Sequence, residues 1–216
     1  PTPGTSPSFR AWIVGDSGTG GSDQIAVRNA MVAYTGAARP DFMLHVGDIA
    51  YTSGSETEFT DFHFTMYQDI LRHTTHWPTL GNHEGASTTS GQPGASTGPY
   101  YDAFVLPTAA EAGGTASGTE AYYSFDYGNT HFISLNSYQV SRSGTGPMAT
   151  WLTTDLASTS AQWIIAYWHH PPYTHGTHNS DTETELREMR ANILPILEAG
   201  GVDLVLSGHS HVYERS

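Results

Sequence analysis

The sequence predicts an α/β fold, because short apolar segments alternate with segments of helical spacing along the 216 residues of the chain. Five of these apolar segments lead directly into an Asp, Asn or His residue, a pattern typical of strands that end at a binding site. The length suits a single domain, and no internal repeat divides the chain. We therefore expect one domain over residues 10–216, preceded by a linker or disordered N-terminus over residues 1–9.

The first half of the chain contains three expected strands and two expected helices. The strands are apolar runs at residues 9–15, 42–47 and 77–80. Helical spacing over residues 22–36 predicts the first helix, with Ser22 as its N-cap. The second helix begins at the capping-box pair Ser55 and Glu58 and extends to about Arg72.

The middle of the chain contains a hairpin and a helix between polar loops. Residues 121–136 are rich in β-forming side chains around Gly128 and Asn129, which predicts a hairpin with its turn at these two residues. Pro147 suits the first turn of a helix that ends near Ala157. The polar loops are residues 85–99 and 107–119.

The last part of the chain contains two buried strands separated by a helix. The strands are the apolar runs at residues 162–168 and 202–208. Thr182 and Glu185 repeat the capping-box pattern at the start of the helix, and Pro195 predicts a kink within it. Gly200 and Gly201 are expected to end this helix.

Composition excludes several classes of protein. Acidic residues number 21 and basic residues 8, all of them Arg, which gives a net charge of −13 and disfavours a nucleic-acid partner. A chain without Lys has no P-loop nucleotide site, and a chain without Cys has no disulfide, thiolate zinc site or catalytic thiol. No apolar run approaches the roughly 20 residues of a membrane span, so we expect no membrane partner either.

Polar side chains follow each of the five apolar segments. They are Asp16, Asp48, Asn82, His169, and the pair His209 and His211. The carboxyl ends of strands in an open α/β sheet form the usual ligand crevice, and oxygen and nitrogen donors of this kind suit Fe, Mn or Zn. Each pattern alone has an ordinary explanation, such as a turn, a helix cap or an edge strand. Their joint occurrence favours a metal site.

These five blocks, in this order, resemble the metallophosphoesterase superfamily and, within it, the purple acid phosphatases. The family pattern is GDxG, GDxxY, GNH(E/D), VxxH and GHxH. The blocks here are Gly15-Asp16-Ser17-Gly18, Gly47-Asp48-Ile49-Ala50-Tyr51, Gly81-Asn82-His83-Glu84, Ala166-Tyr167-Trp168-His169 and Gly208-His209-Ser210-His211. The fourth block departs from the pattern, with Ala166 in place of Val. Of the neighbours His169 and His170, the family spacing to Pro171 favours His169 as the ligand.

The resemblance implies a calcineurin-like αββα sandwich, with two mixed sheets flanked by helices, as the catalytic domain. It also implies a dinuclear metal centre. Asp16, Tyr51 and His211 would hold Fe³⁺, since phenolate and carboxylate are hard anionic donors. The second metal, Zn²⁺, Fe²⁺ or Mn²⁺, would be held by Asn82, His169 and His209, and Asp48 would bridge both metals. Tyr51 distinguishes the purple acid phosphatases, since the wider superfamily usually lacks it.

The function implied by the resemblance is hydrolysis of phosphate monoesters, with a small phosphate ester as substrate and a metal-bound hydroxide as the attacking group. His83 is the candidate for binding the phosphate or protonating the leaving group. His175 and His178 are further candidates for substrate contacts, on a loop where family members often carry a histidine. The remaining histidines, at positions 45, 63, 73, 76 and 131, are expected to be ordinary structural or surface residues.

Other functions stay open at this point. A phosphodiesterase or nucleotidase of the same superfamily would use the same blocks. A GDSL-type serine esterase would use Ser17 as its nucleophile, but the Asp-x-x-His that this class needs near the C-terminus is absent. The metals could also be purely structural, although structural sites are normally closed.

The resemblance carries two further expectations. Family members usually add strands after the GHxH block, so we expect a second fragment or further C-terminal chain to complete the sheet. We also expect an extracytoplasmic or secreted location.

Overall fold

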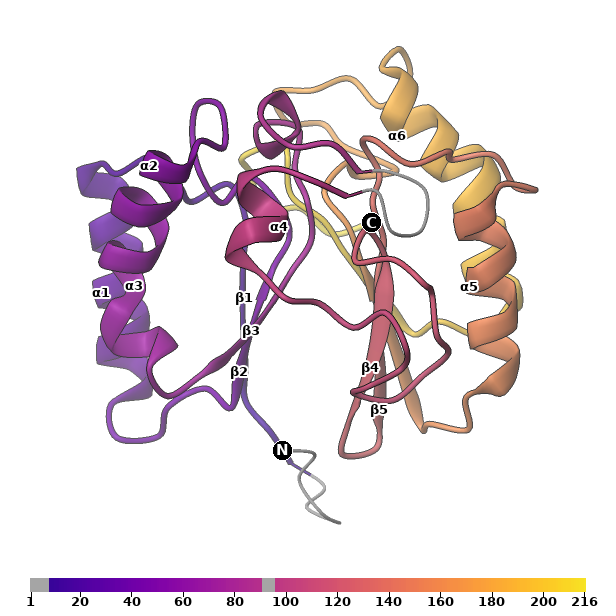
Figure 1. Cartoon of the computed structure of the whole chain (residues 1–216), viewed down its shortest axis with the longest axis horizontal. Coiled ribbons are helices and arrows are strands. Elements are labelled where there is room, and N and C mark those ends of the chain that lie inside the picture. Colours follow the sequence, from indigo (N-terminus) through magenta and orange to yellow (C-terminus); the bar gives the residue numbers. More distant parts are fainter. Residues whose placement is uncertain (1–7, 91–95) are drawn as a thin grey trace.

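Two β-sheets lie face to face between two layers of helices (Figure 1). The computed structural model describes residues 8–90 and 96–216, so most of the expected linker at residues 1–9 lies outside the described residues. The arrangement confirms the expected αββα sandwich.

The first sheet contains three strands in the order β1, β2, β3. Their bounds are β1 (Ala11–Val14), β2 (Phe42–His45) and β3 (Thr75–Pro78). Val14 pairs with His45, and His45 pairs with Pro78, so the three strands end at the same level. Both pairings are parallel, and the expectation that this sheet would be mixed was wrong for its described strands. The reason is that helices connect consecutive strands, which returns each strand in the same direction.

The second sheet contains four strands in the order β4, β5, β6, β7 and is mixed, as expected. Their bounds are β4 (Tyr123–Tyr127), β5 (Thr130–Ser134), β6 (Trp163–Tyr167) and β7 (Leu204–Leu206). The first two strands form the expected antiparallel hairpin, in which Gly128 adopts a φ of +64° at the turn. The other two strands run parallel to β5.

The helices cover the outer faces of the sheets, with α1 and α3 beside the first sheet and α5 and α6 beside the second (Figure 1). Their bounds are α1 (Ser22–Thr35), α2 (Glu56–Glu58), α3 (Thr65–Leu71), α4 (Pro99–Ala103), α5 (Pro147–Ser158), α6 (Thr184–Glu188) and α7 (Leu194–Ala199). Two π-helical segments, Phe59–Phe64 and Met189–Ile193, continue α2 into α3 and α6 into α7. No helix of the described ranges is both long and apolar enough to cross a membrane.

The helix ends confirm some expectations and correct others. Ser55 and Glu58 form the expected capping box. Ser22, expected as an N-cap, is instead the first residue of α1, because the chain is still extended at Gly21. The second expected capping box is also wrong, since Glu183, and not Thr182, immediately precedes α6. The π-helical segment before α7 ends where Pro195 has no backbone N–H to donate.

The core between the sheets is built largely from aromatic rings. Trp77 of β3 stacks on Phe125 of β4 at a centroid distance of 4.0 Å, and Phe125 stacks on Phe132 of β5 at 4.9 Å. Phe42 of β2 is fully buried and meets Phe132 at 5.3 Å. Burying a side chain of this size stabilises the fold by about 1.5–3 kcal/mol, so these contacts fix the two sheets against each other.

A buried ion pair ties the second sheet to its covering helix. His131 of β5 is fully buried, with Nδ1 2.7 Å from the Asp126 carboxylate and Nε2 2.9 Å from Asp155 of α5. Burial acts to lower the pKa of His131, but the hydrogen bonds to the two carboxylates outweigh it and raise the pKa to about 9. His131 is therefore a charged structural residue.

Replacing this histidine tests the ion pair through the pH dependence of stability. The folded pKa of about 9 exceeds the ordinary value of 6.5, so the stabilisation is complete below pH 6.5 and is lost as the pH rises through 9. We expect wild type to lose on the order of 3 kcal/mol of unfolding free energy across this range, and His131→Gln to lose much less. Denaturant unfolding at a series of pH values measures both.

Two further variants complete this test. His73→Gln alters an exposed histidine and should retain the wild-type pH slope. Asp126→Asn, at a partly exposed carboxylate, should reduce the slope without removing a buried group. Identical pH slopes in wild type and both ion-pair variants would contradict a charged His131.

Candidate metal centre

The strand ends of both sheets meet at one place, where the backbone adopts unusual conformations. Asp16, Asp48, His209 and His211 all have a positive φ, between 52° and 71°. Among the described residues only one other non-glycine residue, Ala110, has a positive φ. Such conformations are uncommon for residues with a Cβ atom and concentrate at functional sites. His209 and His211 both lie in a loop after β7, which agrees with their expected place after the last strand.

Glycines in the motifs make room for the candidate ligands. A Cβ atom on Gly81 would overlap the Asp48 carboxylate. Gly47, at a φ of +92°, lies so close to the His169 ring that a Cβ atom would stand 2.5 Å from Nδ1. The small residues beside the candidate ligands are thus required by the close approach of side chains from other strands.

Asp48 lies at the centre of the cluster. Its Oδ2 atom is 3.2 Å from His169 Nε2 and 3.1 Å from the Tyr51 hydroxyl, and its Oδ1 accepts the backbone N–H of His83 at 3.0 Å. One carboxylate therefore contacts residues of both expected ligand sets, as a bridging ligand must.

The first expected ligand set converges beside Asp48. The Tyr51 hydroxyl is 3.3 Å from Asp16 Oδ1 and 3.1 Å from His211 Nε2, and His211 Nε2 is 3.4 Å from Asp16 Oδ1. Metal–ligand bonds of about 2.0–2.2 Å place neighbouring ligand atoms about 3 Å apart, so these three groups fit a shared ion.

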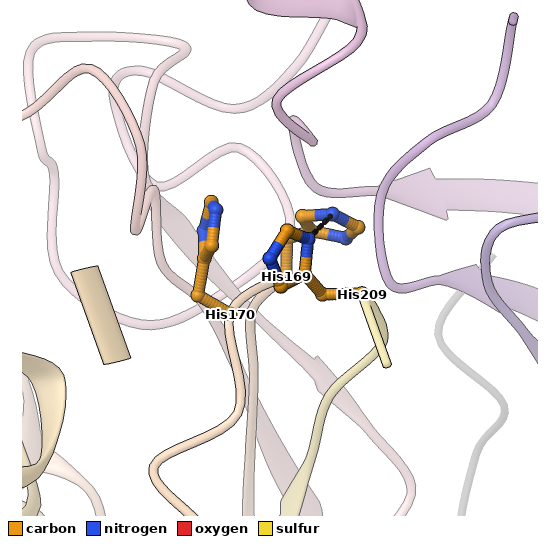
Figure 2. A group of neighbouring side chains, drawn as sticks. All are labelled: His169, His170 and His209. Atoms are coloured by element: carbon orange, nitrogen blue, oxygen red, sulfur yellow. Dashed lines mark hydrogen bonds between the residues drawn. The ribbon is translucent and has the colours of Figure 1, made fainter. Parts of the chain in front are cut away.

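The second expected ligand set also converges. His169 Nε2 is 3.0 Å from Asn82 Oδ1 and 3.2 Å from His209 Nδ1, and the latter contact joins the two rings in Figure 2. His169 Nδ1 donates to the Val46 carbonyl at 2.8 Å, which leaves the Nε2 lone pair of a neutral ring for a metal. These donors fit a borderline divalent cation.

Burial and the charges of neighbouring groups shift the pKa values within the cluster. Burial acts to lower the pKa of His169, but Asp48 outweighs it and raises the pKa to about 9, while, against the effect of burial, the contacts with His169 lower the pKa of Asp48. Burial raises the pKa of Asp16, and Asp48 adds to this effect against the opposing charge of His169. Burial and the carboxylates of Asp16 and Asp48 also raise the pKa of the Tyr51 phenol well above its ordinary value. A cation bound among these groups would favour their anionic forms, so the donor set is chemically suited to a metal.

His169 is separated from its neighbour His170 by the direction of their side chains. His170 is almost fully buried, with Nδ1 2.9 Å from the Ser137 hydroxyl, and its ring stacks near Tyr138 at 5.8 Å. It also lies 4.4 Å from the His209 ring (Figure 2). His169, and not His170, contacts both Asn82 and Asp48.

The three expected catalytic histidines occupy different places. His83 donates from Nδ1 to the Thr52 carbonyl at 2.7 Å, and its Nε2 is 3.9 Å from Asp48. His178 stacks on His209 at 3.6 Å, so it borders the cluster. His175 is exposed, and its backbone N–H bonds to Glu214. The structure thus brings His83 and His178 to the cluster, whereas the described contact of His175 is made by its backbone.

Two acidic residues near the cluster received no role from the sequence. Glu183 lies between His178 and His209, and its position near a helix start was the only feature of the sequence that marked it. Partial burial acts to raise the pKa of Glu183, but hydrogen bonds from Asn179 and His178 lower it. Glu84 is the last residue of the Gly81-Asn82-His83-Glu84 block, and this position in a motif could have indicated that it has a role in the site.

Glu84 is a buried carboxylate that binds four backbone N–H groups. It accepts them from Asp48 at 3.0 Å, Ile49 at 2.7 Å, Ala50 at 2.9 Å and Gly81 at 2.9 Å. Burial and the nearby Asp48 raise the pKa of Glu84 to about 7, although the backbone N–H groups act against this. Glu84 therefore holds together the loops that follow β2 and β3.

Residues 9–213 match the family model of the calcineurin-like phosphoesterases, and the chain therefore belongs to this family. The resemblance seen in the five motifs is confirmed. Among its relatives are two proteins of Arabidopsis thaliana. Purple acid phosphatase 23 is 36% identical over 139 residues, covering 62% of this chain and 28% of its own length. The probable inactive purple acid phosphatase 9 is 29% identical over 201 residues, covering 83% and 30%.

Solved structures share the fold. The purple acid phosphatase isolated from yellow lupin (Lupinus luteus) seeds superposes with a TM-score of 0.71 at 19% identity, covering 99% of this chain and 41% of that protein. The inner-membrane-complex anchor GAP50 of Plasmodium gives a TM-score of 0.62 at 18% identity, covering 94% and 66%. The chain spans less than a third of the length of the two Arabidopsis relatives.

Substituting Glu84 tests its role in holding the loops. Glu84→Ala leaves four backbone donors without their partner, and we expect unfolding free energy to fall by about 3–5 kcal/mol. Glu84→Gln keeps one carbonyl acceptor and should lose less. Glu56→Ala, at an exposed residue of α2, is the control. Denaturant unfolding measures all three, and a loss below about 1 kcal/mol in Glu84→Ala would contradict this role.

Proposed function

We propose that this chain hydrolyses phosphate monoesters at a dinuclear metal centre. The observation that carries the proposal is the convergence of two donor sets on Asp48, with neighbouring donor atoms 3.0–3.4 Å apart. The family and its purple acid phosphatase relatives support phosphoric ester hydrolysis. Two metal ions in such a centre supply an activated water and neutralise charge on the phosphoryl oxygens.

The identity of the metals follows from the donors. Asp16, Tyr51 and His211 would hold Fe³⁺, because phenolate and carboxylate are hard anionic ligands. Asn82, His169 and His209 would hold Zn²⁺, Fe²⁺ or Mn²⁺, because imidazole and amide donors are neutral and borderline. Asp48 would serve both metals.

The substrate is anionic and the chain has a net charge of −13, so the site must supply positive charge locally. Arg142, which donates to the Tyr138 carbonyl, is engaged by Glu185 and Glu188. The metals and neutral or charged histidines are therefore left to bind the phosphate.

His83 is the best candidate for contact with the phosphate or the leaving group. Its Nδ1 proton is held by the Thr52 carbonyl, so its Nε2, on the side of Asp48, is the nitrogen left to face a ligand. About a third of the His83 side chain is exposed, which leaves it open to a ligand. A general acid in this position typically contributes 10²–10⁴-fold to the rate. His178 and, further out, His175 remain candidates for contacts with the rest of the ester.

One contact supports the serine esterase alternative, but a second contact that a catalytic triad requires is not found among the described residues. The Ser17 hydroxyl is 2.9 Å from His45 Nε2, as in a serine–histidine pair. However, His45 Nδ1 has no hydrogen-bond partner among the described residues, whereas a catalytic triad needs an acid there. His45 instead packs among His63 and His76, with ring centroids 4.8–6.0 Å apart.

Two wider expectations also belong to this proposal. A further strand from another segment or chain would pair with β7, which lies at the edge of its sheet with Leu204 nearly half exposed. An extracytoplasmic location rests on the family resemblance alone.

The proposed function is tested by phosphate release from nitrophenyl phosphate, with bis(nitrophenyl) phosphate as the diester. We expect a faster reaction with the monoester and complete inhibition by a chelator. Asp48→Asn should lose both metals and more than about 100-fold in kcat/KM, since even residues that only support a metal ligand contribute 10–100-fold. Ser17→Ala should keep its activity within a few fold. A faster diester reaction would favour a phosphodiesterase, and a chelator-resistant enzyme that Ser17→Ala inactivates would favour the esterase.

The Fe³⁺ assignment has its own spectroscopic test. If Tyr51 binds Fe³⁺ as a phenolate, the iron-loaded, oxidised protein should absorb visible light through ligand-to-metal charge transfer. Tyr51→Phe should abolish this band while the melting temperature of the metal-free protein stays near that of wild type. Tyr173→Phe, at an exposed tyrosine, should retain the band. A colourless wild type that contains Fe³⁺ would contradict the assignment.

A further inference from the structure

Glu183 lies where two histidines of the proposed site meet. Its Oε2 atom is 2.9 Å from His178 Nδ1 and 3.5 Å from His209 Nε2. Its Oε1 atom accepts the backbone N–H of Asn179 at 2.6 Å, which anchors the carboxylate in its loop. A single carboxylate therefore faces one histidine proposed to bind metal and another proposed to contact the substrate.

The two ring nitrogens of His209 face different partners. Its Nδ1 is 3.2 Å from His169 Nε2, on the side of the second ligand set (Figure 2). Its Nε2 is buried and makes no hydrogen bond with any described residue, and Glu183 Oε2 is the acceptor that lies near it. A separation of 3.5 Å is long for a hydrogen bond, so a shift of about 0.5 Å would give this buried nitrogen its partner.

The neighbouring rings restrict how His209 can turn. His178 stacks on it at a centroid distance of 3.6 Å and an interplanar angle of 29°. His170 and His169 lie 4.4 and 5.0 Å from it. Because His209 is only 7% exposed, packing restricts its ring, and the partners of its two nitrogens then decide where its proton lies.

An ionised carboxylate only accepts hydrogen bonds, so its partners must carry protons. We propose that Glu183 is a positioning residue that fixes the tautomers of His178 and His209. With the proton held on Nε2, neutral His209 offers the lone pair of Nδ1 to the second metal. With its proton held on Nδ1 by Glu183, His178 keeps the ring orientation in which it stacks on His209. This inference rests on the proposed function.

Glu183→Gln tests the inference with little change in shape. If the Gln carbonyl keeps the Asn179 N–H, its NH₂ group faces the two rings and requires an acceptor nitrogen from them. The tautomers then reverse, and the proton of His209 moves to the nitrogen that should bind metal. We expect the dissociation constant of the second Zn²⁺ to rise about 10–100-fold, the usual effect of losing a residue that orients a metal ligand. Competition with a chelator measures this constant.

The matched control is Asp181→Asn, which removes the same charge from the same loop. The Asp181 carboxylate is largely exposed and lies 3.2 Å from Arg190, so its loss should leave Zn²⁺ affinity unchanged. Glu183→Asp keeps an acceptor-only group and should recover part of the affinity lost in Glu183→Gln. Nitrogen NMR of ¹⁵N-histidine-labelled, metal-free protein reports the tautomers directly, and Glu183→Gln alone should shift them.

The outcomes separate this inference from the proposed function. A wild type that binds no second metal would refute the metal centre itself. A wild type that binds two metals, together with a Glu183→Gln variant of unchanged affinity and tautomers, would overturn only the role of Glu183. Equal losses in Glu183→Asp and Glu183→Gln would also overturn it, because the loop and not the proton position would then be the cause.

Discussion

The site depends on one buried carboxylate that the chain satisfies almost entirely with backbone N–H groups. Glu84 accepts hydrogen bonds from four residues in two loops, and those loops carry Asp48, Asn82 and His83. A buried acid without such partners would be strongly destabilising, so the loops and the carboxylate stabilise each other. The positions of Asp48 and His83 follow from this arrangement.

The sheets supply the second constraint. Parallel pairing in register makes β1, β2 and β3 end at one level, and aromatic stacking between Trp77 and Phe125 fixes the second sheet against the first. Residues far apart in sequence then meet. For example, the backbone N–H of His209 donates to the Asp16 carboxylate at 2.9–3.0 Å. The two sheets bring the candidate metal-binding side chains together, and the conformations of the loops set their directions.

The sequence predicted the strand ends, the hairpin at Gly128 and the Ser55–Glu58 capping box, because each depends on local patterns of polarity and turn residues. It did not predict the left-handed conformation of His209 and His211, because a His-Ser-His pattern occurs equally in strands and in loops. Glu183 was missed because its partner His209 is distant in sequence. The parallel pairing of the first sheet was not predicted, because the expectation of mixed sheets came from the family resemblance. The order of helices and strands had not been used for it.

The left-handed conformations of Asp16, Asp48, His209 and His211 lower the stability of the folded chain. Each such conformation costs about 1 kcal/mol or more, so together they approach the lower end of a domain's total stability, about 5 kcal/mol. Ligand binding to the folded state adds stability in proportion to the logarithm of ligand concentration. If these residues bind metal, the stability of the folded chain depends on the local concentration of metal ions. A shortage of metal would then lower the amount of folded protein as well as the rate of the reaction.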